Sequence, residues 1–150
     1  MTLLAPYDGS DLSKTAVKRA TEFADYRGEE VAVLTVVPED EAFAVERDWI
    51  TPGEEYDPAD IERRFEREVQ AIAPETTFRT ERPDESAAVA ATTINDITRK
   101  IREVARNLDA SIVFVGSDNA GRVSTPVTSV GSPISEDPEY DVHIVRHAEV

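Results

Sequence analysis

The chain has 150 residues, no cysteine and a formal net charge of −15, with 31 acidic against 16 basic residues. We expect one domain spanning residues 1–150, and the missing cysteines exclude a disulfide, a Cys-ligated zinc site and a thiol nucleophile. Because nucleic acids and anionic membrane surfaces are held by clustered lysine and arginine, this charge argues against both as partners.

The first part of the chain is typical of a strand–helix–strand unit. Residues 2–6 predict a short apolar strand that ends at Tyr7-Asp8-Gly9-Ser10, and a helix is predicted from Asp11 to Tyr26, stopped by Gly28. Residues 30–37 are almost continuously apolar, as expected of a parallel strand covered on both faces, and Pro38 ends them. Such crossovers are nearly always right-handed.

A long polar connection is predicted from Glu39 to Tyr56, and it holds the only tryptophan, Trp49. We expect Trp49 to cover the edge of the core rather than to stack on a base. Asp57-Pro58 provides an N-cap and a first helical residue, and apolar residues then recur at helical spacing as far as Ile72. Residues 76–81 alternate weakly and predict an edge strand.

The second part of the chain continues the alternation of strands and helices. Residues Asp84 to Thr92 are interpreted as an insertion, and a helix opened by the box Thr93-x-x-Asp96 follows. Residues 111–115 predict a buried strand, a short helix is expected from Ser132 to Pro138, and Val142 to Arg146 form the last strand. Five strands alternating with four helices predict an α/β fold with an open parallel sheet.

The loop after the fourth predicted strand, from Gly116 to Ser132, combines glycines and hydroxyl residues with the start of a helix. Exposed backbone N–H groups before a helix N-terminus form a site for anions such as phosphate. The same residues also suit plain turn and cap chemistry, with Ser132 as the N-cap and Pro133 as the first helical residue.

Gly121, nine intervening residues and Gly131-Ser132 resemble the Gly-x2-Gly-x9-Gly-Ser/Thr pattern of nucleotide-binding universal stress proteins. Pro6-x-Asp8-Gly-Ser10 is similar to the opening of that family, and the likeness covers nearly the whole chain. One departure stands out, because Gly116 precedes Gly121 by four intervening residues in place of two. The resemblance implies a Rossmann-like sheet of strand order 3-2-1-4-5.

The family likeness also implies a site, because open α/β sheets bind ligands where the strand order reverses. Asp8 would face the ribose, the backbone at Val36 and Val37 would meet the adenine edge, and the glycine-rich loop would hold phosphates. For Asp8, a plain turn or N-cap carboxylate is an equal alternative. ATP, with Mg²⁺ if it binds, is the implied cofactor, although Asp118 adds repulsion near its phosphates. The implied binding residues are Pro6, Tyr7, Asp8, Val36, Val37, Val115, Gly116, Gly121, Arg122, Gly131 and Ser132.

Catalysis has little support in the sequence, and we expect no enzyme. The two histidines, His143 and His147, belong to the last strand and its end, and the chain has no P-loop and no helical pair of metal-binding histidines. Two functions remain: a stress-response protein that binds an adenine nucleotide without efficient turnover, and a module of the same fold that binds a protein partner. The last strand is a sheet edge, so we expect a homodimer formed through Val142 and Ile144, as the family likeness also implies.

The cations comprise thirteen arginines and only three lysines, a composition that resembles proteins of salt-loving archaea. Molar salt shortens the Debye length to about 3 Å and so screens repulsion among surface carboxylates. An acidic docking face or a metal buffer is the alternative, but the acids are spread along the whole chain. The N-terminus has no basic region before its short apolar run, and no long apolar span follows, so a cytoplasmic location is expected.

Overall fold

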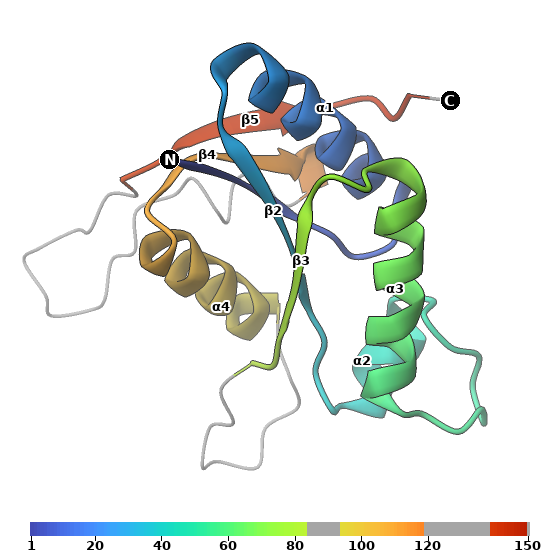
Figure 1. The fold of residues 1–150 in the computed structure, drawn as a ribbon. Coiled ribbons are helices and arrows are strands. Elements are labelled where there is room, and N and C mark those ends of the chain that lie inside the picture. The colour runs from blue at the N-terminus through green and yellow to red at the C-terminus, as the bar shows by residue number, and fades with distance from the viewer. Residues whose placement is uncertain (84–93, 119–138, 150) are drawn as a thin grey trace, which may run out of the picture.

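The fold is built on a five-stranded parallel sheet of order β3-β2-β1-β4-β5 (Figure 1). The computed structural model describes residues 1–83, 94–118 and 139–149. The strands are β1 (Thr2–Pro6), β2 (Glu30–Val36), β3 (Thr77–Glu81), β4 (Ala110–Gly116) and β5 (Asp141–Val145). Every neighbouring pair is parallel. The α/β fold and strand order expected from the sequence are therefore confirmed.

Helices cover both faces of the sheet. Helices α1 (Asp11–Arg27) and α3 (Pro58–Ile72) lie on one face, and α4 (Ile94–Asn107) lies on the other (Figure 1). The central strands alternate between the two cores: in β1, Leu3 packs with the first face and Leu4 with the second. This alternation follows from the two-residue period of a strand, and it explains why apolar runs buried on both sides mark these strands.

Local sequence signals set the ends of the helices. Ser10 caps α1 by accepting from the N–H of Ser13, and Gly28 ends it in the left-handed conformation at φ 69°. Asp57 caps α3 by accepting from the N–H of Ala59, and Pro58 takes the first turn as expected. Side-chain caps satisfy N–H groups that have no partner within a helix, which is why these positions are readable in a sequence.

The polar connection from Glu39 to Tyr56 is not wholly a loop, and here the sequence expectation was wrong. It contains a short helix, α2 (Glu41–Glu46), capped by Asp40, whose carboxylate accepts from the N–H groups of Ala42 and Phe43. Phe43 and Ala44 are buried in the first core, which stabilises a helix too short to persist alone. Three sequence expectations lie outside the described residues. They are the insertion from Asp84 to Thr92, the residue Thr93 of the expected capping box, and the helix from Ser132.

The carboxyl ends of β1, β2 and β4 meet at one edge of the sheet (Figure 1). After β1 the chain turns into α1, whereas β4 lies on the opposite side of β1 from β2. The reversal of strand order therefore falls between β1 and β4. Within the described part of the chain, no helix combines the length and apolar character needed to cross a membrane.

Candidate functional site

A cleft opens at this reversal point, at the carboxyl ends of the central strands. Six residues expected from the sequence line it: Pro6, Tyr7, Asp8, Val36, Val115 and Gly116. Residues from α4 form one wall, and residues from α2 and the segment after it form another. The remaining described lining residues are Ser10, Ser13, Leu34, Phe43, Arg47, Trp49, Ile97, Thr98, Ile101 and Asp118.

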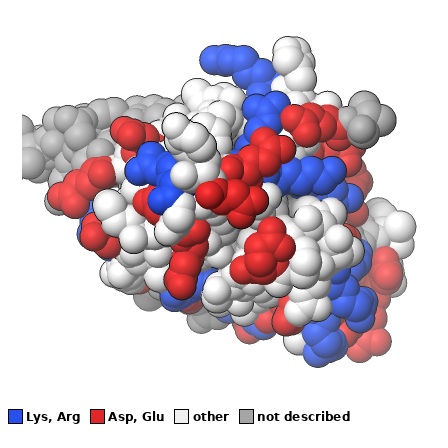
Figure 2. All heavy atoms as spheres, turned by 45° about the horizontal axis from the view of Figure 1, so that its top comes forward, with Lys and Arg blue, Asp and Glu red and all other residues white. Residues whose placement is uncertain are grey.

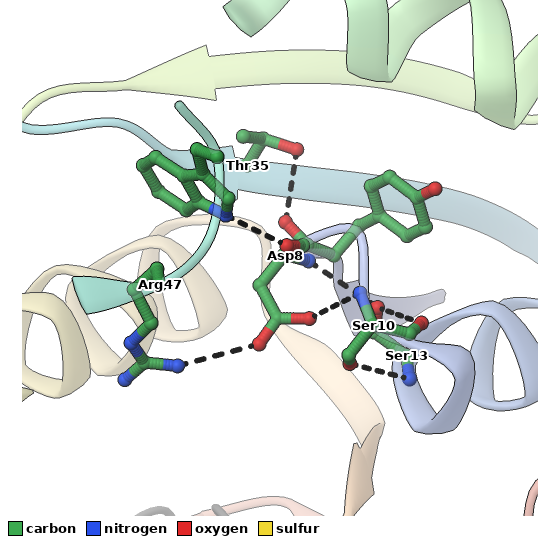
Figure 3. Close-up of polar contacts among 7 residues, drawn as sticks. Asp8, Ser10, Ser13, Thr35 and Arg47 are labelled. Carbon is green, nitrogen blue, oxygen red and sulfur yellow. Dashed lines mark hydrogen bonds and ion pairs between the residues drawn. The ribbon is translucent and has the colours of Figure 1, made fainter. Parts of the chain in front are cut away.

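The turn from β1 into α1 fixes the backbone beside the cleft. Asp8 Oδ1 accepts a hydrogen bond from the N–H of Ser10 at 3.0 Å, and the N–H of Asp8 donates to Ser13 Oγ at 3.3 Å (Figure 3). The carbonyl of Tyr7 accepts from the buried hydroxyl of Thr35 at 3.1 Å. Asp8 is therefore a turn carboxylate, as one interpretation of the sequence held, while its second oxygen stays directed into the cleft.

The second oxygen of Asp8 meets a residue that the sequence did not single out. Arg47, just after α2, places a guanidinium nitrogen 3.5 Å from Asp8 Oδ2 (Figure 3). The same guanidinium lies over the ring of Phe43, 5.2 Å from its centroid. Arg47 was missed because α2 was read as loop; the available signal was Asp40 followed by an acidic first turn, which is typical of a helix start.

Trp49 covers the edge of the core, as expected. Its side chain is 7% exposed and lies edge-on to Phe43 and Phe65, with ring centroids 5.7 and 5.5 Å apart. Its indole N–H donates to the carbonyl of Asp8 at 3.0 Å. Trp49 therefore ties the segment after α2 to the turn after β1 and brings Arg47 to the cleft.

The cleft is narrow and continues into a wider hollow. Its volume is about 50 Å³, against about 550 Å³ for the adjoining hollow, and the two share Asp8, Ser10, Arg47, Trp49 and Asp118. Small-molecule sites usually measure about 300–1,000 Å³. The cleft alone is therefore smaller than a usual small-molecule site, whereas the adjoining hollow falls within that range.

Not every residue expected at the site lies there. Val37 does not line the cleft, because it is fully buried and its N–H donates to the carbonyl of Glu81 at 3.0 Å. Gly116 lies at the exit of β4, where a Cβ would come within 2.7 Å of Asp118 Oδ1 and 2.9 Å of Leu12 Cβ. Only glycine fits there without a shift of its neighbours. The residues Gly121, Arg122, Gly131 and Ser132 lie outside the described part of the chain.

The titratable aromatic groups near the sheet are held by packing. Burial raises the pKa of Tyr7 well above its ordinary value, and the phenol donates to Glu68 Oε1 at 2.6 Å, which raises the pKa further. Burial, with a smaller effect of Arg19, lowers the pKa of His143, which packs against Phe23 and Phe114. Among the described residues, no group of three or more His, Cys, Asp or Glu is placed to hold a metal ion.

Comparisons with known structures show the same fold in several universal stress proteins. A universal stress protein in complex with cAMP is 21% identical, with 99% of this chain and 98% of that chain covered at a TM-score of 0.54. The Archaeoglobus fulgidus universal stress protein in complex with dAMP is 19% identical, with coverages of 97% and 98% and a TM-score of 0.55. UspA from Lactobacillus plantarum is 16% identical, covering 97% of each chain at a TM-score of 0.53.

These identities support a shared fold, and the family itself follows from a sequence-level comparison. No curated protein sequence matches the chain significantly. The model of the universal stress protein family, in contrast, matches residues 1–146. The chain therefore belongs to the universal stress protein family.

Proposed function

We propose that this protein is a cytoplasmic stress-response protein that binds an adenine nucleotide in the cleft between β1 and β4, without efficient turnover. The observation that carries the proposal is the cleft itself: an apolar slot at the strand-order reversal with the Asp8 carboxylate at its mouth. Open α/β sheets bind ligands at this place. Two structures of the same fold, with cAMP and with dAMP, support an adenine ligand.

The lining of the cleft suits a nucleoside. Apolar side chains from β2, β4 and α4 provide the surface that a base requires, and they are Leu34, Val36, Ile97, Ile101 and Val115. Asp8 has one oxygen occupied by the turn and a second that can accept the hydroxyl hydrogens of a ribose. Binding of phosphates by Gly121, Arg122, Gly131 and Ser132, and of ATP with Mg²⁺, stays a prediction from the family pattern.

Binding without efficient turnover is part of the proposal. The Tyr7 phenol donates to Glu68 of α3, and burial raises its pKa, so it keeps its proton and does not act as a base near neutral pH. The homodimer through Val142 and Ile144 is also proposed. In the described part of the chain, β5 pairs with β4 on one side only, and Ile144 is 36% exposed.

A module that binds a protein partner is the second candidate, and one observation favours it. The ion pair between Arg47 and Asp8 and the 50 Å³ cleft leave little room for a base until side chains move. The two candidates differ in whether an adenine ligand binds at all.

The deciding experiment is a calorimetric titration of the purified protein with adenosine, AMP and ATP. We expect adenine-dependent binding that GMP does not reproduce. Asp8→Asn keeps the turn but loses the charge, so adenosine affinity is expected to fall about tenfold, the usual effect of removing a charged hydrogen-bond partner. Asp25→Asn, an exposed residue of α1, serves as the control. Absence of binding to the wild-type protein would reject the nucleotide proposal and leave the interaction module.

A further inference from the structure

Helix α2 and the turn after it, as far as Trp49, form one compact unit. The N–H of Asp48 donates to the carbonyl of Val45 at 3.1 Å, and the N–H of Trp49 donates to the carbonyl of Ala44 at 2.9 Å. Asp48 takes the left-handed conformation between them, at φ 59°. These two bonds form a Schellman cap, and the contact between the rings of Phe43 and Trp49 adds the apolar contact that usually accompanies it. The unit is therefore held together by its own contacts.

This unit meets the rest of the molecule on two sides. On the side of α3, Arg64 Nη1 donates to the carbonyl of Trp49 at 3.0 Å, and the Trp49 ring lies edge-on to Phe65. On the side of the cleft, two polar contacts both end on Asp8. The indole N–H of Trp49 donates to the Asp8 carbonyl at 3.0 Å, and a guanidinium nitrogen of Arg47 lies 3.5 Å from Asp8 Oδ2 (Figure 3). The closed position on the cleft side thus depends on one residue of the turn after β1.

The unit stands between the cleft and the adjoining hollow, because Arg47 and Trp49 belong to the described lining of both. The contact between Arg47 and Asp8 is longer than a usual charge-assisted hydrogen bond. Its two side chains are 28% and 24% exposed, and ion pairs that water reaches are weak. The side of the unit that faces the cleft is therefore held less firmly than the side that packs on α3.

We propose that residues 41–49 are a flap that turns about its contacts with α3, and that Asp8 holds this flap closed over the cleft. Opening breaks the two contacts with Asp8, keeps the hydrogen bonds within the unit, and joins the cleft to the hollow. Phe43 and Ala44, which pack in the first core, keep the closed form the main one. Movable segments of this kind control access to many binding sites.

The flap gives Asp8 two partners that exclude each other. Its Oδ2 either pairs with Arg47 in the closed form or accepts a hydrogen bond from a ligand in the open form. Its Oδ1 keeps the hydrogen bond from Ser10 in both forms. Ligand binding and opening are then coupled, because a ligand that occupies Oδ2 removes one of the contacts that keep the flap closed. This coupling rests on the proposed function, whereas the flap itself does not.

The flap is tested first in the protein without ligand. The chain has one tryptophan, so its indole N–H gives a single signal in nuclear magnetic resonance. Hydrogen exchange of this group and of the backbone N–H groups of Asp48 and Trp49 is measured for the wild-type protein, Arg47→Gln, Arg47→Lys and Arg63→Gln. Arg63 is the matched control, because its side chain is 60% exposed on α3 and pairs with Asp60. Thermal unfolding checks that each variant is folded.

We expect Arg47→Gln to speed exchange of the indole N–H about two- to fivefold, the effect of losing a partly exposed ion pair. The backbone N–H groups of Asp48 and Trp49 should stay as protected as in the wild-type protein, because the unit turns without unfolding. Arg47→Lys should have a smaller effect and Arg63→Gln none. An indole rate that Arg47→Gln leaves unchanged would overturn the flap. Equal acceleration of the indole and backbone groups would also overturn it, since the segment would then unfold rather than turn.

Adenosine, which carries no charge, tests the coupling. In calorimetric titrations, Arg47→Gln is expected to bind adenosine about two- to fivefold more tightly than the wild-type protein, because a larger fraction of the molecules is open. Arg63→Gln should match the wild-type protein. If adenosine binds but Arg47→Gln binds it no more tightly, the coupling is overturned while the proposed function stands. If adenosine binds to neither protein, the proposed binding of a nucleoside in the cleft fails, and the exchange rates alone decide the flap.

Discussion

Tyr56 closes the segment that carries α2, Arg47 and Trp49. Its phenol donates to the carbonyl of Pro38 at 2.6 Å, so the two ends of the segment are joined by one hydrogen bond. Burial raises the pKa of Tyr56 to about 12, and nearby carboxylates raise it while Arg82 opposes them. The protonated phenol is thus part of the folded state.

This pKa predicts how stability depends on pH. Between the ordinary pKa of 10 and about 12, the unfolded chain loses the proton that the folded chain keeps, so the free energy of unfolding falls as pH rises through this range. Tyr56→Phe is expected to cost about 1 kcal/mol near neutral pH through the lost hydrogen bond, and to flatten the alkaline decline. Urea unfolding at several pH values measures both effects, with Tyr26→Phe as the control, since Tyr26 is 91% exposed. An alkaline decline as steep in Tyr56→Phe as in the wild-type protein would contradict the assignment.

Asp8 shows how far a single residue can be read from the sequence. Its place after an apolar strand and before Gly9-Ser10 predicted a turn carboxylate, and the likeness to the family implied a ribose ligand as an equal alternative. The structure gives the turn role to Oδ1 and leaves Oδ2 facing Arg47. The start of α2 carries a local signal at Asp40, but the position of Arg47 at the cleft depends on Trp49 and Phe43 packing into a core built from distant parts of the chain. Contacts of this kind depend on the whole fold, so a single residue's neighbours in sequence do not reveal them.

At the scale of elements, the sequence predicted the strands and the capped helices α1 and α3, but it did not predict the short helix α2. The strands β1, β2 and β4 gave buried apolar runs, and α1 and α3 gave caps at Ser10 and Asp57. Helix α2 has six residues, and its stability comes from Phe43 and Ala44 in the core rather than from helical periodicity. The last strand was placed one residue late, and β5 begins at Asp141 and ends at Val145.

Among the described strands, β5 pairs with β4 alone, and this predicts how the protein associates. An unpaired strand edge with little charge at its centre is usually covered, and a second copy related by twofold symmetry does this by pairing strand with strand. Ile144→Lys adds a charge at the strand centre while keeping the backbone N–H, so we expect it to give a monomer. Ile144→Val should remain a dimer. Light scattering in molar KCl measures the mass of the particle in solution. A monomeric wild-type protein would contradict the dimer, and a dimeric Ile144→Lys variant would show that the interface lies elsewhere.

At the scale of the whole molecule, acidic residues are spread along the entire sequence. Figure 2 shows acidic and basic side chains interspersed on one face of the protein. Several arginines are paired, such as Arg82 with both Glu39 and Glu62. Exposed pairs of this kind contribute only about 0.2–1 kcal/mol each and weaken in salt. The net charge of −15 acts in the opposite direction, because salt relieves its self-repulsion.

The excess of acids therefore predicts stabilisation by salt, the behaviour expected of a protein adapted to high salt. We expect the thermal midpoint to rise from dilute buffer to molar KCl, because relief of repulsion among unpaired carboxylates outweighs the weakening of the ion pairs. Circular dichroism at stepped KCl concentrations measures the midpoint. KCl and tetramethylammonium chloride at equal ionic strength should act alike if screening is the cause. A midpoint that stays level or falls would reject the salt-adaptation interpretation.

The most direct test of the nucleotide-binding account is native mass spectrometry of the protein, first as purified and then after addition of AMP. The account predicts a species heavier than the free chain by one adenine nucleotide per chain. Added AMP should increase the abundance of this species, and GMP at the same concentration should not. If both samples contain only the free chain, and the protein is shown to be folded, the account is contradicted and a module that binds a protein partner is favoured.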